Sequence, residues 1–117
     1  MLPAALAASG CASMGPYSSG DARFGGRENL GLIAHEAIRE ASGLAASRNH
    51  QGVLWTHNDS GSPPAVYALN MRGEHLGKYV LHGCTDGDWE DIALGPGPAP
   101  GQDYLYVGAI GDNRARR

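Results

Sequence analysis

The sequence predicts an all-β protein, because glycine is abundant, charged residues are few and the apolar residues come in short runs. Of 117 residues, 18 are glycine and 7 are proline, and 18% are charged. Average proteins have about 7% glycine and about 25% charged residues. Short strands joined by tight turns fit this composition better than a helical bundle does. The length allows one small domain.

Charge and cysteine content narrow the function. The net charge is −3, which gives no basic surface for nucleic acid, and the terminal Arg114, Arg116 and Arg117 are interpreted as solvated. The two cysteines, Cys11 and Cys84, do not form a metal-type CxxC pair. A disulfide between them stays open as an alternative in an exported protein.

The first fifteen residues are small and apolar, with no charge before Asp21. They predict a signal-peptide or lipoprotein leader over 1–15, and the alternative is a disordered leader of small residues. Ala8-Ser9-Gly10-Cys11 resembles a bacterial lipoprotein box, which would make Cys11 a lipid anchor. No transmembrane span is expected, because the stretch is shorter than the roughly 20 residues that a bilayer requires. The expected location is the bacterial cell envelope or the extracellular space.

Residues 16–39 are interpreted as a tether followed by a short ordered element. Pro16 to Asn29 is rich in Ser and Gly, which is typical of a flexible linker. Gly31 to Ala41 has apolar spacing that suits a short helix, and a strand is the alternative.

From Glu40 onward the pattern is that of an antiparallel meander. Turn residues separate four short apolar or β-branched runs. One four-stranded sheet of this kind is a β-propeller blade. The predicted strands are Gly43–Ser47, Val53–Asp59, Ala65–Asn70 and His75–Gly83.

The pattern then starts again. Asp91–Pro96 repeats the character of the first run, and Tyr104–Gly111 that of the second. Leu44 aligns with Ile92 at an offset of 48, and Leu54 with Leu105 at an offset of 51. A period near fifty is within the range of propeller repeats. The prediction is therefore an incomplete β-propeller over 40–117, with one blade at about 40–83 and half of a second at about 88–117.

Five motifs carry a family resemblance: EASGL, LWTHNDSG, VYALN, DWEDIA and YLYVGAIGDN. In this order, over Glu40 to Asn113, they resemble a family of exported bacterial β-propellers related to the phytase-like (esterase-like) and gluconolactonase-like propellers. Ala109 departs from it, since such proteins tend to carry aspartate there. The resemblance implies that the chain is the N-terminal part of a longer protein, inactive by itself.

The acidic residues gather where predicted strands end. In a propeller these ends meet at the mouth of the central channel, where carboxylates repel each other unless a cation neutralises them. Oxygen ligands in a flexible arrangement suit calcium. The resemblance implies that Glu40 is also a metal ligand, because a glutamate at the start of the first blade helps to bind metal in gluconolactonase-like propellers. The predicted metal ligands are Glu40, Asn58, Asp59, Asp91 and Asp112.

Ordinary turn chemistry is the alternative for most of these residues. Asp59-Ser60-Gly61 and Asp112-Asn113 suit tight turns, and Glu90 with Asp91 can cap one. Asp86 and Asp88 are expected to be solvated, although Asp86-Gly87-Asp88 matches part of a calcium loop.

Two hypotheses for the complete protein follow. The first is a calcium-dependent hydrolase of esters, lactones or phosphoesters, in which His57 or Glu90 moves the proton. His57 can equally be a buried strand residue. The second is a non-catalytic exported propeller that binds a small ligand or a protein partner. Propellers host both kinds of function, so the fold does not decide between them.

Overall fold

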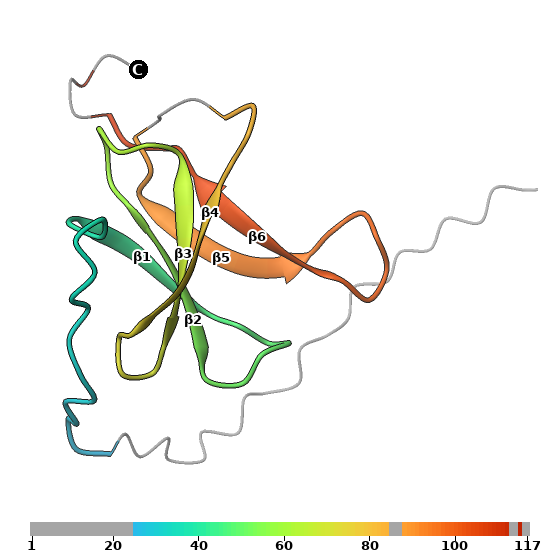
Figure 1. Ribbon diagram of the computed structural model, residues 1–117. Coiled ribbons are helices and arrows are strands. Elements are labelled where there is room, and N and C mark those ends of the chain that lie inside the picture. The colour runs from blue at the N-terminus through green and yellow to red at the C-terminus, as the bar shows by residue number, and fades with distance from the viewer. Residues whose placement is uncertain (1–24, 85–87, 113–114, 116–117) are drawn as a thin grey trace, which may run out of the picture.

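The computed structural model describes residues 25–84, 88–112 and 115. Within these residues there are strands and no helix, which confirms the predicted all-β class. Four antiparallel strands form a first sheet in the order β1-β2-β3-β4, and two form a second sheet (Figure 1). Neither sheet closes on itself. The strands are β1 (Ala41–Ala46), β2 (Val53–Asn58), β3 (Ala65–Asn70), β4 (His75–Val80), β5 (Asp91–Pro96) and β6 (Asp103–Gly108).

All six strands lie where the sequence predicts them. The bounds of β3 and β5 agree with the prediction, whereas β1 begins two residues earlier and β4 ends three residues earlier. The short helix or strand expected at Gly31–Ala41 is not formed: 31–40 is irregular with one turn, and only Ala41 belongs to a strand. The predictions for the leader and most of the tether, including Cys11, lie outside the described residues.

Strand β3 is the centre of the structure. Its first five residues are all buried, because alternate side chains of a strand point to opposite faces and both faces of this strand are covered. Tyr67 and Leu69 pack with Ile38 on one face. Val66 packs with Trp89 and Ile92 on the other. The sequence AVYALN is therefore almost continuously apolar.

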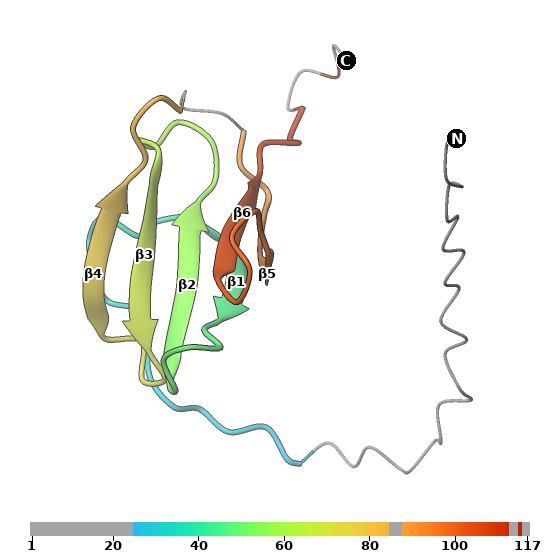
Figure 2. The same cartoon turned by 90° about the vertical axis from the view of Figure 1, so that its right-hand side faces the viewer.

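The second sheet covers the Val66 face of the first. β5 lies against β1, and Figure 2 shows both strands of the second sheet beside the β1–β2 end of the first. Partly buried apolar side chains from both sheets fill the space between them. Those packed around the buried centre of this layer are Ala45, Trp55, Leu81, Leu105 and Val107.

The register of the second sheet repeats that of the first. Shifting β1 by 48 residues and β2 by 51 maps three cross-strand pairs of the first sheet onto three pairs of the second. These are the two offsets that the sequence predicts. The pairs are Leu44–Thr56 onto Ile92–Val107, Ala45–Trp55 onto Ala93–Tyr106, and Ala46–Leu54 onto Leu94–Leu105.

The β3–β4 turn is held by one asparagine. Asn70 Oδ1 accepts hydrogen bonds from the backbone N–H groups of Arg72 (2.9 Å) and Glu74 (3.0 Å). Gly73 has a φ of 81°, and a Cβ there would lie 2.7 Å from the carbonyl oxygen of Leu32. A left-handed backbone and a close neighbour both favour glycine at this position.

Candidate metal centre

The residues at the end of β2 position the first carboxylate of the candidate centre. Thr56, His57 and Asn58 are buried, and Thr56 Oγ1 donates a 2.6 Å hydrogen bond to the carbonyl of Gly43 in β1. Asp59 follows directly, and its N–H donates to the carbonyl of Glu40 at 2.9 Å. These bonds fix the backbone that leads into Asp59 against β1 and the residue before it.

The linker before β5 supplies two more carboxylates. Trp89 is 7% exposed, and its ring meets the His57 ring edge-on with centroids 5.9 Å apart. The carboxylates of Asp88 and Glu90, on either side of Trp89 in the sequence, both lie beside Gly111. The backbone of Glu90 is tied on both sides: its N–H donates to Gly108, and its carbonyl accepts from Ser42 Oγ at 3.1 Å.

Asp59, Asp88 and Glu90 converge. One carboxylate oxygen from each lies within 4.8 Å of the other two, which makes a group that could hold a metal ion. At this separation two unit charges repel by about 1 kcal/mol in water and by several kcal/mol at an effective dielectric constant near 20. A cation would remove this repulsion.

Gly111 packs directly against the group. It is buried, and its N–H donates a 3.1 Å hydrogen bond to the carbonyl of Asp88. A Cβ at this position would clash with Glu90 Oε1 and would lie 2.6 Å from Asp88 Oδ2. The glycine of the GDN motif therefore leaves room for the two carboxylates.

Alanine at Gly111 is expected to displace the Asp88 and Glu90 carboxylates and to weaken calcium binding at least about tenfold, since even indirect changes around a metal typically cost 10–100-fold. The matched control is Gly61→Ala, where no atom lies within 4 Å of an added Cβ. Gly61 has a φ of 77°, which strains alanine there, whereas Gly111 has no positive φ. The control therefore carries a backbone cost that the tested variant lacks, and only the tested variant displaces the carboxylates. Calorimetric titration measures the effect, and equal affinities in the two variants would contradict it.

The other predicted ligands lie near the group or are engaged elsewhere. The Asn58 amide binds the preceding segment: Oδ1 accepts from the N–H groups of Arg39 (3.1 Å) and Glu40 (3.3 Å), and Nδ2 donates to Ala37 at 2.7 Å. Asp91 Oδ1 accepts from the N–H of Ile92. The group of three does not include Glu40, Asp91 or Asp112, all of which are exposed.

Asp88 is the member that the sequence analysis did not select. The sequence analysis expects Asp88 to be solvated, because Asp86-Gly87-Asp88 matches only part of a calcium loop, and Asp86 itself lies outside the described residues. The available signal was Asp88-Trp89-Glu90, in which two acidic residues flank the tryptophan.

His57 has no access to solvent. It is 0% exposed, and its Nδ1 lies 2.8 Å from the carbonyl of Asn58, so Nδ1 carries the proton. Among the residues that the structure describes, none is a hydrogen-bond partner of Nε2, which faces Gly43, where an added Cβ would lie 2.9 Å away. The ring therefore packs between β1 and Trp89.

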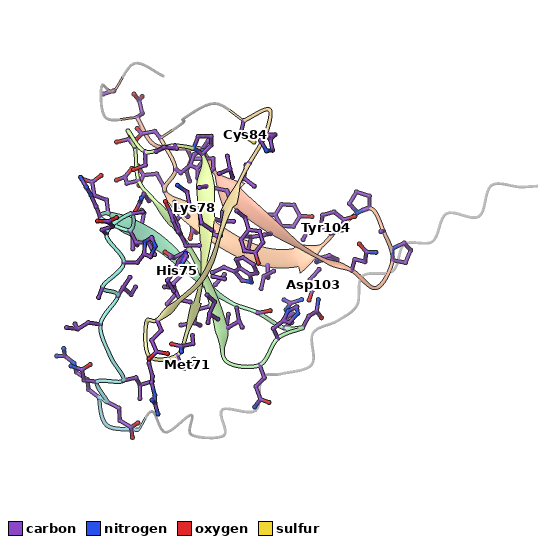
Figure 3. All side chains as sticks on the ribbon, in the orientation of Figure 1. Met71, His75, Lys78, Cys84, Asp103 and Tyr104 are labelled. Carbon is purple, nitrogen blue, oxygen red and sulfur yellow. The ribbon has the colours of Figure 1, made fainter. Side chains whose placement is uncertain are left out.

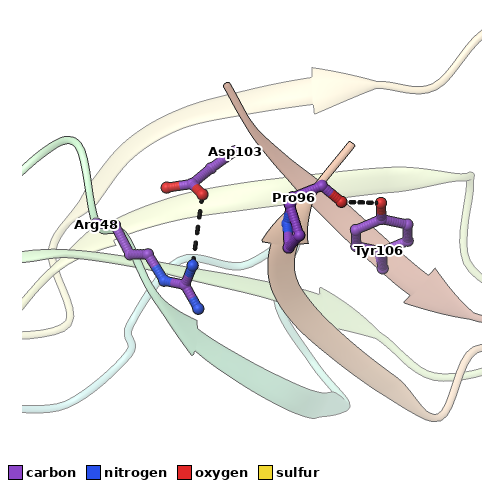
Figure 4. Close-up of polar contacts among 4 residues, drawn as sticks. All are labelled: Arg48, Pro96, Asp103 and Tyr106. Carbon is purple, nitrogen blue, oxygen red and sulfur yellow. Dashed lines mark hydrogen bonds and ion pairs between the residues drawn. The ribbon is translucent and has the colours of Figure 1, made fainter. Parts of the chain in front are cut away.

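A separate cleft opens at the other end of the stacked sheets. It has a volume of about 290 Å³ and is lined by Trp55, Tyr79 and Leu105 among others. At its rim Arg48 pairs with Asp103 at 3.5 Å, and nearby Tyr106 donates to the carbonyl of Pro96 (Figure 4). The ion pair is largely exposed on the arginine side and contributes little to stability.

Comparison with known proteins does not assign the chain to a family. No family model, curated protein or solved structure matches it. What the structure defines is an all-β architecture of a four-stranded and a two-stranded antiparallel sheet with an acidic group at one end.

Among the described residues no helix is long and apolar enough to cross a membrane. Cys84 is a free, exposed thiol (Figure 3).

Proposed function

We propose that this chain binds a divalent cation, calcium, at Asp59, Asp88 and Glu90. The supporting observation is the convergence of three carboxylate oxygens within 4.8 Å of one another. Calcium holds its oxygen ligands at roughly 2.3–2.6 Å, so two ligands on one ion are at most about 5 Å apart. The observed limit fits that span.

The donor set favours calcium over other metals. Magnesium requires ligands at roughly 2.0–2.1 Å in near-ideal octahedral geometry and usually keeps several waters, whereas calcium accepts a flexible arrangement of carboxylates. Zinc favours histidine and cysteine, and the group contains neither. Three carboxylates leave coordination positions for water or backbone oxygens, as is usual for calcium.

The bound ion would join the two sheets. Asp59 belongs to the end of β2 in the first sheet, whereas Asp88 and Glu90 lead into β5 of the second. An ion that binds only the folded state stabilises it by about 2.7 kcal/mol at a hundred times its dissociation constant. The proposed role is therefore structural: calcium fixes the second sheet on the first.

This role has more support than the hydrolase hypothesis. Glu90, expected to move a proton, lies in the acidic group and would act as a ligand. His57 is fully buried. A metal-dependent hydrolase of esters, lactones or phosphoesters stays a proposal for a longer assembly of such sheets, in which the ion would polarise the substrate and activate water.

A propeller-type stack is the architecture we propose for that assembly. The support is the second sheet, which repeats the register of the first and packs on its face. Export and lipid attachment at Cys11 belong to the same proposal and rest on the sequence of the first fifteen residues.

Isothermal titration with calcium tests the site. The wild-type chain is expected to bind one ion, and Asp88→Asn is expected to weaken binding at least about tenfold because a charged ligand is lost. The double variant Asp59→Asn, Glu90→Gln should abolish it. Glu36→Gln is the matched control, since Glu36 is exposed and outside the group. Absence of binding by the wild type, or an equal loss in the control, would overturn the proposal.

A further inference from the structure

The two sheets stack in the same orientation, which leaves one complementary face open at each end. Leu44 and Leu54 lie on the face of the first sheet that points away from the second, with Leu69. Their equivalents, Ile92 and Leu105, face the first sheet. The outer face of the first sheet therefore carries apolar side chains at the positions equivalent to those by which the second sheet packs on the first.

The outer face of the second sheet presents the other half of the same joint. Trp55 and its cross-strand partner Ala45 contact the second sheet. Their equivalents, Tyr106 and Ala93, are also cross-strand partners, but they point outward and are exposed, Tyr106 by 50%. The β1–β2 part of the outer face of the first sheet and the outer face of the second sheet are thus equivalent in sequence register to the two surfaces that pack together between the sheets.

The open face of the first sheet is a groove. It has a volume of about 420 Å³, with Leu44, Leu54 and Leu69 on the sheet side and residues 27–33 along the other. Leu44 is 58% exposed, whereas its neighbour Ala45 on the opposite face of β1 packs against the second sheet. Arg27, Glu28 and Arg72 are the charged residues that line it.

The charged residues beside the groove of the first sheet and on the outer face of the second sheet also favour their association. The hollow on the outer face of the second sheet is lined by Ala93, Tyr106 and Ile110, and Asp91 is its one charged lining residue. The groove carries two arginines and one glutamate, so the faces have opposite net charge. Long-range attraction therefore favours the same pairing that the repeat predicts.

We propose that a second copy of this chain docks its outer β5–β6 face into the Leu44 groove of the first, head to tail. The contact would reproduce between chains the packing that already exists between the two sheets of one chain. Such a heterologous contact joins copies head to tail, into a ring or an open chain according to the rotation between them, so the assembled mass rises with concentration. The proposal is independent of the calcium site.

Sedimentation velocity over a wide range of concentration tests this. The wild-type mass is expected to rise above the 12.2 kDa of the monomer as concentration increases. Leu44→Lys places a charge in the groove of the first sheet, and Ala93→Lys places one on the outer face of the second sheet. Each variant alone should therefore stay monomeric, because one of its two contact surfaces is disrupted. Their equimolar mixture should double in mass to a dimer and go no further, because each variant retains the side that the other lacks.

Leu76→Lys is the matched control, since Leu76 is 54% exposed on β4 and lines neither the Leu44 groove nor the hollow at Tyr106. It should associate like the wild type. Circular dichroism verifies that the variants fold, and Tyr106→Lys replaces Ala93→Lys if that one does not. A wild-type chain that stays monomeric, single variants that still associate, or a mixture that forms no dimer would each overturn the proposal.

Discussion

Replacing Trp89 with alanine is expected to lower the free energy of unfolding by about 3–5 kcal/mol, the usual cost of removing a large buried aromatic side chain. Trp89 is 7% exposed and packs with Val66 and Ile92 in the layer between the sheets. A small domain has only about 5–15 kcal/mol of stability in total. The loss would therefore leave the second sheet weakly attached.

Urea denaturation followed by circular dichroism measures this effect. Leu76→Ala is the control, because that side chain is 54% exposed and should cost within about 0.5 kcal/mol. If Trp89→Ala were as mild as the control, the inter-sheet core described above would not be the main source of stability.

The second large effect is expected at Gly43, where alanine should cost about 1–3 kcal/mol through overpacking. An added Cβ would lie 2.8 Å from both the backbone nitrogen and Cγ2 of Ile92, and 2.9 Å from His57 Nε2. Backbone cannot move aside as a flexible side chain can, so β5 would be pushed away from β1.

Gly77→Ala is the matched control for Gly43→Ala. Gly77 also lies in a strand, β4, but its Cβ would meet only the Tyr79 side chain, at 3.2 Å, which is half exposed and free to shift. The same urea titration compares the two variants. A loss at Gly77 equal to that at Gly43 would mean that strand glycine in general, rather than close contact of the sheets, sets the cost.

The sequence predicts the strands more accurately than the strand ends and the irregular segment that precedes the first strand. AVYALN and DIALGP are bounded by turn residues on both sides, and β3 and β5 have those bounds. β1 begins earlier than expected because Ala41 pairs with Asn58 across an irregularity in the ladder, which is a tertiary contact. Residues 31–40 are held by Asn58 and by packing of Ile38 on β3, with neither helix nor strand.

Of the three acidic residues that converge, the sequence predicts one as a metal ligand. Asp59 is predicted as a ligand because it ends a strand, and Glu90, which lies in a motif, is predicted as a proton-transfer residue. Asp88 is expected to be solvated, and its proximity to Asp59, which is distant in sequence, arises only in the folded chain. Asn58 has the residue type of a calcium ligand, yet its amide holds the backbone of 37–40. Residue type and spacing do not reveal such competing hydrogen bonds.

Terbium luminescence tests the calcium site most directly. Terbium replaces calcium at oxygen sites and emits when a nearby tryptophan transfers energy to it, an effect that falls steeply with distance. Trp89 lies between two of the proposed ligands, whereas Trp55 is four residues before Asp59 along β2, about 13 Å at the strand rise of ~3.3 Å per residue. We expect sensitised emission that calcium displaces, that Trp89→Phe loses and that Trp55→Phe retains. Emission that depends on Trp55 alone, or none from the wild-type chain, would contradict a cation at Asp59, Asp88 and Glu90.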